Sequence, residues 1–194
     1  MDKKESTLFN MVFTLFVITA VSSASLGFMY ELTKEPKAAA EWVKLNFAIK
    51  AVLPDFDNDP VKEVFRIESY DGGERLICYP AIKNEDLTGI AVKTWTTKGF
   101  SGMVRLMVGF DYKGNIINIT VLEQKETPGL GTKMVDAEFK DQYNGLNPGA
   151  DNLAVKKDGG KIDGITAATI SARAFSDAVD RAYRSVDNAG MFVK

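Results

Sequence analysis

Three hydroxyl side chains lie within six residues near the C-terminal end of the chain. They are Thr166, Thr169 and Ser171, and the small residues around them leave the oxygens little hindered. A helix is predicted to begin at this point, and the N–H groups at a helix start, together with hydroxyls, can hold an anion such as phosphate. Thr169 or Ser171 can also simply cap the helix, and from the pattern alone capping is the simpler interpretation.

The composition limits what chemistry the side chains can do unaided. The 24 Lys and Arg residues nearly balance 26 Asp and Glu residues, which gives no reason to expect a nucleic-acid partner. Histidine is absent, so no Ser-His-Asp or Cys-His site exists within the chain, and the commonest metal ligand is missing. The single cysteine, Cys78, is expected to be a buried small apolar residue. We therefore expect no catalytic residue and no metal site, and any redox chemistry must come from a bound cofactor.

The predicted helix after the hydroxyls has one apolar face, which predicts packing against a sheet. The residues of that face are Ala172, Phe175, Val179, Ala182 and Val186. Two favourably ordered i,i+4 ion pairs are expected on its charged side, Asp177 with Arg181 and Asp180 with Arg184.

A β-hairpin is the clearest predicted element in the middle of the chain. Residues 103–111 and 115–122 flank a two-residue turn at Lys113-Gly114. That turn fixes a register in which one face is entirely apolar. The predicted pairs are Phe110 with Ile117, Val108 with Ile119, Leu106 with Val121, Met107 with Thr120 and Arg105 with Leu122. Two further strands are predicted at 76–81 and 88–97.

The same register, carried beyond the strand ends, places Ser101 opposite Glu126. The segments "KGFSG" (98–102) and "ETPGLG" (126–131) then meet at one end of the hairpin. Both are rich in glycine, which lets backbone N–H groups approach a ligand closely. Two ordinary neighbouring loops are the alternative interpretation.

The N-terminal segment Leu8–Tyr30 contains no charged residue. As a helix it spans roughly 34 Å, slightly more than the hydrocarbon core of a bilayer. A retained transmembrane anchor is the favoured interpretation and a cleaved signal peptide the alternative. Lysines occur on both sides of the span, so the charge pattern leaves its orientation open; they are Lys3, Lys4, Lys34 and Lys37.

A helix is also predicted directly after the apolar span. Pro36 suits its first turn, and Pro54 ends it. Apolar residues recur along this stretch at helical spacing, at Trp42, Leu45, Ala48 or Ile49, and Val52.

Three segments carry a resemblance to a known family. "DGITAATIS" (163–171) resembles the flavinylation motif of the FMN-binding domain family, and "ETPGLGTK" (126–133) and "KGFSG" resemble two further signatures. In that family a flavin transferase uses FAD to join FMN, through its phosphate, to the last threonine of the motif, here Thr169. The family usually has glycine where this chain has Ala167, which matters if the position needs a positive φ.

The resemblance implies an α+β fold, with one N-terminal transmembrane helix followed by an extracytoplasmic sheet-and-helix FMN-binding domain. It also implies a set of cofactor-binding residues around Thr169. These are Ser101, Gly102, Glu126, Thr127, Gly129, Leu130, Gly131, Lys133, Asp163, Thr166 and Ala168. Glu126 and Lys133 are polar candidates near the flavin, with a merely solvated position as the alternative for each.

With one membrane span and this length, the chain resembles the G subunit of the Rnf-type ion-translocating ferredoxin:NAD oxidoreductase. The expected partners are the other membrane subunits, the flavin transferase and membrane lipid, and the expected place is the cytoplasmic (inner) membrane with the FMN domain on the periplasmic side. The expected division is a tail and span at 1–30, a juxtamembrane helix and loop at 31–60, and the FMN-binding domain at 61–194. Alternatives are the C subunit of a sodium-pumping NADH:quinone oxidoreductase and a membrane-tethered binding module without redox function.

Overall fold

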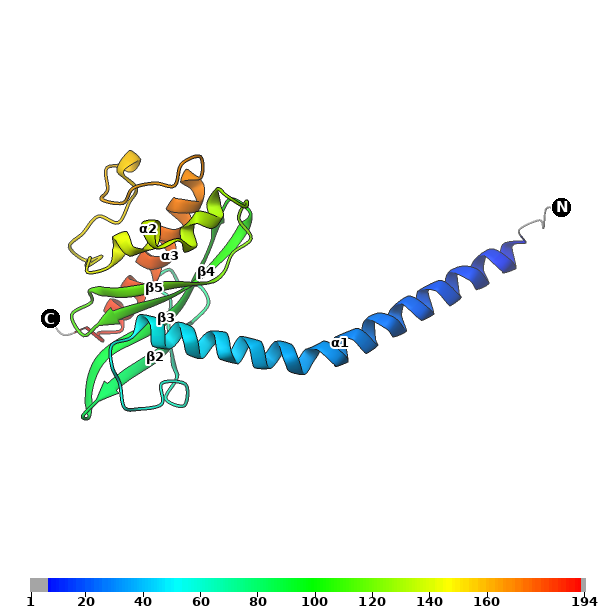
Figure 1. The fold of residues 1–194 in the computed structure, drawn as a ribbon, viewed down its shortest axis with the longest axis horizontal. Helices are drawn as coiled ribbons and strands as arrows, with labels where there is room; N and C mark the ends of the chain where they lie inside the picture. The colour runs from blue at the N-terminus through cyan, green and yellow to red at the C-terminus, as the bar shows by residue number, and fades with distance from the viewer. Residues whose placement is uncertain (1–6, 193–194) are drawn as a thin grey trace. The chain divides into compact units, whose positions relative to one another are not determined.

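The computed structural model describes residues 7–192 as an α+β protein, as predicted (Figure 1). Residues 1–6, with Lys3, Lys4 and most of the predicted tail, lie outside the described residues, as do 193–194. The strands are β1 (Phe65–Ile67), β2 (Leu76–Lys83), β3 (Asp86–Gly99), β4 (Gly102–Asp111) and β5 (Ile116–Glu123). The helices are α1 (Leu8–Val52), η1 (Gly131–Val135), α2 (Ala137–Lys140), η2 (Asp141–Tyr143), η3 (Lys156–Asp158) and α3 (Thr169–Asn188).

Helix α1 is long enough and apolar enough to cross a membrane, and its most apolar window is not buried within the protein. The predicted helix after the apolar span is confirmed up to Val52, just before Pro54, but its predicted start near Pro36 is wrong, because α1 continues through this proline. Proline lacks the N–H that would bond the carbonyl of Leu32, a loss the helix tolerates. Alanine and lysine, which favour helix, follow directly. The chain divides into two compact units, one ending at Val43 and the other beginning at Lys44.

The five strands form one antiparallel sheet in sequence order, from β1 at one edge to β5 at the other. The predicted strands at 76–81 and 88–97 are confirmed as β2 and β3, which extend further at their ends. Strand β1 was not predicted, because three residues are too few to show a period of two. The sheet is thus a meander in which sequence neighbours are also neighbours in space.

The central register of the β4–β5 hairpin is confirmed. Leu106 pairs with Val121 and Val108 with Ile119, as alternation of apolar residues required. Met107 pairs with Thr120, also as predicted.

Both ends of the predicted hairpin register are wrong. Phe110 pairs with Ile116 instead of Ile117, and Arg105 pairs with Glu123 instead of Leu122, because the register shifts at two points along β4. The turn also has three residues, since the Asp111 N–H donates to the carbonyl of Asn115 at 2.9 Å. Its last residue, Gly114, has a φ of 85°, which glycine adopts without strain.

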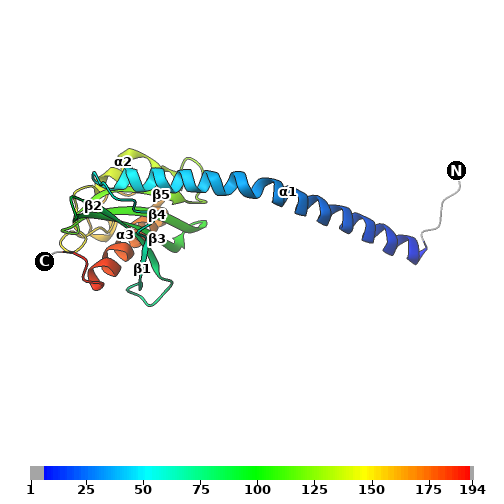
Figure 2. The same ribbon diagram turned by 90° about the horizontal axis from the view of Figure 1, so that it is seen from below.

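Side chains on the two faces of the sheet enter two different cores. Figure 2 shows the strands between the last turns of α1 and helix α3. Ala48, Ile49 and Val52 pack on one face, against residues that include Met107. A Cβ on Gly109 would lie 1.8 Å from the Val52 carbonyl oxygen, so this close approach of helix and strand requires glycine.

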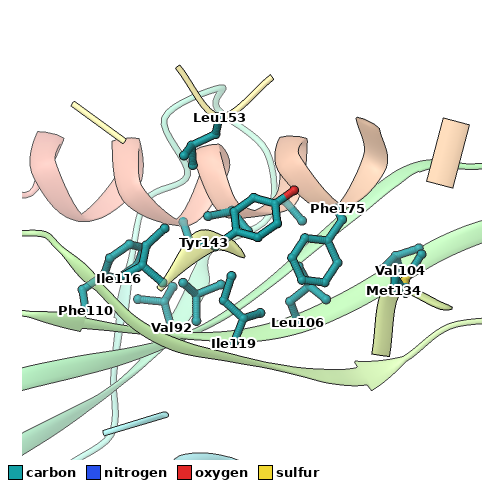
Figure 3. Packing of buried hydrophobic residues seen from close by; sticks show 14 of the residues in the cluster. Val92, Val104, Leu106, Phe110, Ile116, Ile119, Met134, Tyr143, Leu153 and Phe175 are labelled. Carbon is teal, nitrogen blue, oxygen red and sulfur yellow. The ribbon is translucent and has the colours of Figure 1, made fainter. Parts of the chain in front are cut away.

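The larger core lies between α3 and the other face of the sheet (Figure 3). The five residues predicted as the apolar face of α3 are all fully buried. Phe175 points from α3 toward the sheet and lies beside Tyr143, with ring centroids 5.0 Å apart. This packing fixes α3 on the sheet and thereby positions the helix start that carries the hydroxyls.

Candidate functional site

Strand β3 holds α3 through a series of side chains that face the helix. The Thr94 hydroxyl donates to the carbonyl of Ala178 at 2.9 Å, and the Thr96 hydroxyl donates to Asp177 at 2.7 Å. Lys98, further along the strand, forms an ion pair with Asp177 at 2.5 Å. The contacts therefore advance toward the N-terminus of α3 as β3 approaches the β3–β4 turn, which brings that turn to the helix start.

One of the two predicted ion pairs on α3 is confirmed. Arg184 lies 2.8 Å from Asp180, as expected for i,i+4 spacing. The predicted pair of Asp177 with Arg181 is wrong. Asp177 forms its ion pair with Lys98 instead, and Arg181 forms an ion pair with Asp71 at 2.7 Å. The sheet and its loops thus supply the partners that the helix alone was expected to provide.

The buried carboxyl group of Glu126 joins three segments at this end of the sheet. Its Oε1 accepts the Ser101 N–H at 3.2 Å, and its Oε2 accepts the Ser171 hydroxyl at 2.8 Å. The predicted meeting of the two glycine-rich loops is therefore confirmed, and a solvated position for Glu126 is wrong, since only 5% of it is exposed. A Cβ on Gly131 would lie 2.6 Å from the Ser171 hydroxyl, so this glycine makes room for the contact.

Within residues 7–192, no side chain caps the start of α3. The N-cap residue is Ala168, and the prediction that Thr169 or Ser171 caps the helix is wrong. Thr169 is already the first helical residue, and the Ser171 hydroxyl is engaged by Glu126. The N–H groups of the first turn, which lack partners within a helix, therefore remain available to an anion.

Ala167 has a φ of 59°, in the left-handed region that favours glycine. The position at which the family usually has glycine thus does need a positive φ. For a residue with a Cβ this conformation costs about 1–2 kcal/mol. The stretch before the helix is consequently strained, and the strain lies two residues from Thr169.

A cavity of about 330 Å³ opens at the helix start. Its lining brings together six of the predicted site residues, which are Glu126, Thr127, Leu130, Gly131, Ala168 and Thr169. It also contains residues that the prediction missed, which are Phe100, Ala167, Ile170 and Ser171. Three large apolar side chains stay exposed here, with 67% of Phe100, 47% of Ile170 and 40% of Leu130 accessible. A planar apolar ring could cover them, while the Thr169 hydroxyl and the helix start could hold a phosphate.

The remaining predicted residues lie around this cavity without lining it. Lys133, Asp163 and Thr166 line a separate cavity of about 340 Å³. Gly102 and Gly129 have positive φ values of 105° and 74° and shape their loops. Ser101 contributes through the N–H that it donates to Glu126. Some of the predicted residues therefore line the cavity at Thr169, and the others line a neighbouring cavity or shape the loops around it.

A third cavity of about 360 Å³ shares Thr169 with the first and includes two lysines that the prediction missed, Lys156 and Lys157. Phe100 lies inside the segment "KGFSG", which the sequence analysis had identified as a candidate loop. That the Phe100 side chain is exposed could not be predicted from the sequence. The lysines gave no such signal, because they follow a long loop whose path the sequence pattern does not define.

Two ionisable groups are perturbed in ways that bear on the chemistry. Hydrogen bonding to the Arg173 guanidinium lowers the pKa of Asp158, which lies in the loop beside Thr169. Burial raises the pKa of Cys78 to about 12, which keeps its thiol protonated and unreactive, as expected from its predicted burial.

Known proteins resemble the chain over most of its length. Residues 99–184 match the model of the FMN-binding domain. The G subunit of the Na(+)-translocating ferredoxin:NAD(+) oxidoreductase complex of Acetobacterium woodii is 31% identical over 93% of this chain and 92% of the relative. The G subunit of the ion-translocating oxidoreductase complex of Cronobacter sakazakii is 33% identical over 87% of this chain and 85% of the relative.

Among solved structures, NqrC of Shewanella oneidensis aligns with a TM-score of 0.47 and 16% identity, over 70% of this chain and 67% of that one. The sequence relatives are much more similar than this structure. On their identity and coverage, the chain belongs to the family of G subunits of ion-translocating oxidoreductase complexes, and it carries an FMN-binding domain.

Proposed function

We propose that this chain is an electron-carrying subunit of an ion-translocating oxidoreductase complex of the Rnf type, with FMN joined by a phosphoester to Thr169. The observation that carries the proposal is the position of Thr169 as first residue of an uncapped helix, at the edge of a cavity with an exposed apolar rim. A phosphate at this position meets the N–H groups and the positive end of the helix dipole.

The residues present fit the two chemically different parts of FMN. Interactions with a helix end contribute about 0.3–1 kcal/mol, enough to orient a phosphate but too little to retain a cofactor, so the covalent bond provides retention. Phe100, Leu130 and Ile170 would offer apolar surface to the isoalloxazine ring, and Glu126, which joins the neighbouring loops, lines the same cavity. FMN, when bound, supplies the electron transfer, and the protein supplies position and environment.

The role as a complex subunit is supported by the similarity to the two relatives. We propose that neighbouring membrane subunits exchange electrons with the cofactor, that a flavin transferase attaches it, and that α1 contacts lipid. We further propose that residues 1–30 anchor the chain in the membrane and that residues 61–194 bind FMN on the extracytoplasmic side. Residues 31–60 then connect the anchor to the FMN-binding domain. Protease added to right-side-out membrane vesicles should then remove the domain, whereas full protection would contradict this sidedness.

The attachment site is tested with a matched pair of threonine variants. Thr169→Val removes the hydroxyl but keeps the β-branched shape, and Thr166→Val makes the same change three residues earlier on an exposed position. Each protein is produced with its flavin transferase, denatured and run on a gel. We expect flavin fluorescence in the wild type and in Thr166→Val, and none in Thr169→Val. A fluorescent band in Thr169→Val would show that another residue carries the cofactor.

The two alternative functions give different results in the same preparations. A tethered binding module without redox function would have the mass of its amino acids alone. The C subunit of a quinone reductase would purify from its own host with quinone-reductase subunits instead of those of a ferredoxin:NAD oxidoreductase. The similarity to relatives that are G subunits favours co-purification with the subunits of a ferredoxin:NAD oxidoreductase.

A further inference from the structure

The loop of residues 156–160 is tied to both sides of the proposed attachment site. Lys156 forms an ion pair with Asp163 at 2.7 Å, six residues before Thr169. Asp158 accepts two hydrogen bonds from Arg173 at 2.7 Å, one helical turn after Thr169. A fork-like pair of this kind fixes orientation as well as distance. The two ties hold the loop beside the start of α3.

The residue between the two ties is Lys157. Lys157 lines the cavity of about 360 Å³ that is also lined by Thr166, Ala167 and Thr169. The neighbouring Lys156 forms the ion pair with Asp163, whereas no direct ion pair joins Lys157 to another of residues 7–192; its charge acts on Asp158 only at longer range and helps to lower the pKa of that carboxyl. A lysine that forms no direct ion pair among these residues therefore lies at the cavity that borders Thr169.

We propose that the Lys157 ammonium pairs with the phosphodiester at Thr169 and so acts as a positioning residue for the cofactor. The inference rests on the proposed function and adds to it the residue that balances the remaining negative charge of the phosphate. The helix start supplies only a partial positive charge of about half a unit, which leaves room for a full counter-charge. Lysine suits this role because its ammonium is a compact charge on a flexible stem.

The pairing would also direct the ring. Thr169 borders two cavities of different character, one with exposed apolar side chains and one with lysines. A phosphate drawn toward Lys157 leaves the apolar cavity to the ring. Loss of the charge should therefore loosen the cofactor's orientation while the covalent bond persists.

The test uses full-length protein carrying the cofactor, in three variants. Lys157→Met removes the charge and retains length, Lys157→Arg retains the charge, and Lys50→Met makes the same change on α1, whose last turns pack on the opposite face of the sheet. The readouts are intact mass, for attachment, and the ³¹P NMR resonance of the phosphodiester, referenced to the unfolded protein.

We expect Lys157→Met to move the resonance part of the way toward the unfolded reference, since the helix start remains, and Lys157→Arg and Lys50→Met to keep the wild-type position. An unchanged resonance in Lys157→Met, with the cofactor attached, overturns the inference and leaves the proposed function standing. A wild-type protein without attached FMN overturns both.

If Lys157→Met fails to acquire the cofactor, a salt titration of the wild type decides. Raising the KCl concentration screens an exposed ion pair and should move the wild-type resonance toward the reference. A resonance that does not respond to salt would contradict the pairing.

Discussion

The two ends of α3 are built in opposite ways. At its C-terminal end, Tyr183 stacks on Phe192 with ring centroids 5.2 Å apart, and Phe110 meets Phe192 edge-on at 5.6 Å. At its N-terminal end, Phe100 and Ile170 remain exposed around a cavity. The helix thus has one end filled by the protein's own rings and one end with apolar surface left for a ligand.

Glycines make room at both ends, but for different neighbours. A Cβ on Gly114 would lie 3.0 Å from the ring of Tyr183, whereas a Cβ on Gly131 would lie 2.6 Å from the Ser171 hydroxyl. The first glycine admits an aromatic core, and the second admits the hydrogen bond of Ser171 to Glu126. Aromatic packing at the filled end therefore contributes to stability, whereas the exposed side chains at the open end leave surface for the proposed cofactor.

Substitution of Phe110 on β4, near one end of α3, and of Phe100 in the β3–β4 turn, near the other end, should give the largest difference in stability. Phe110→Ala removes a fully buried ring and should lower the free energy of unfolding by about 3–5 kcal/mol. Phe100→Ala changes an exposed ring and should alter it by no more than about 0.5 kcal/mol. Urea unfolding of the two variants measures the difference.

The same pair should show the reverse order for the cofactor. Phe100→Ala should lower the fluorescence anisotropy of the attached flavin, because the ring loses an apolar neighbour, and Phe110→Ala should leave it unchanged in the fraction that stays folded. Equal losses of stability in both variants would contradict the distinction between a filled and an open end.

Glu126→Ala should have the next largest effect. The change leaves the Ser101 N–H and the Ser171 hydroxyl without their acceptor, at a cost of about 1–3 kcal/mol for each group that stays buried and unpaired. We expect a loss of roughly 2–4 kcal/mol by urea unfolding. Hydrogen exchange should also become faster at residues 99–102 and 126–131.

Glu126→Gln is the matched control, since it preserves size and one acceptor oxygen. It should cost about 1 kcal/mol, near the value of a single hydrogen bond. Exchange rates in the two loops that do not differ between Glu126→Ala and the wild type would show that the carboxyl group does not join them.

Ala167→Gly should have a smaller effect of opposite sign. Glycine relieves the positive φ of this residue, while its greater freedom in the unfolded chain offsets part of the gain. We expect a stabilisation of up to about 1 kcal/mol by urea unfolding. Ala168→Gly, one residue later and without a positive φ, should not stabilise; equal stabilisation by both would contradict the strain at Ala167.

The smallest expected effect concerns acid and the loop beside Thr169. Arg173 lowers the pKa of Asp158 from its ordinary value of 3.8 in the folded protein. The pair therefore stabilises the loop fully above pH 3.8 and is lost as the pH falls through the lower folded value. NMR titration of the Asp158 carboxyl should give a midpoint below 3.8, and Arg173→Gln should raise it. A wild-type midpoint at or above 3.8 would contradict the tie.

Periodic patterns predicted the filled parts of the fold well. The apolar face of α3 and the centre of the hairpin followed from periods of 3.6 and 2, because burial demands them. The ends of the hairpin failed, since bulges and the Asp111 turn depend on hydrogen bonds that no pattern records. The prediction of a helix start near Pro36 was wrong for a related reason, because the preference of proline for a first turn is local and the surrounding residues keep the chain helical.

The candidate site was predictable only in part. The hairpin correctly brought the segments of Ser101 and Glu126 together, although its register at that end was wrong by one residue, and the family motifs pointed to Thr169. The exposure of Phe100 and the placement of Lys157 arise from tertiary structure, through the β3–β4 turn and the ties of the 156–160 loop. The hydroxyls were of the right type to cap α3, and the sequence could not show that Glu126 engages Ser171 instead.

The most direct test is the mass of the protein purified from its native membrane, followed by peptide mapping. We predict an excess equal to FMN less one water, located on the peptide that contains Thr169. An intact mass that matches the amino acids alone, in a colourless preparation, would contradict the account.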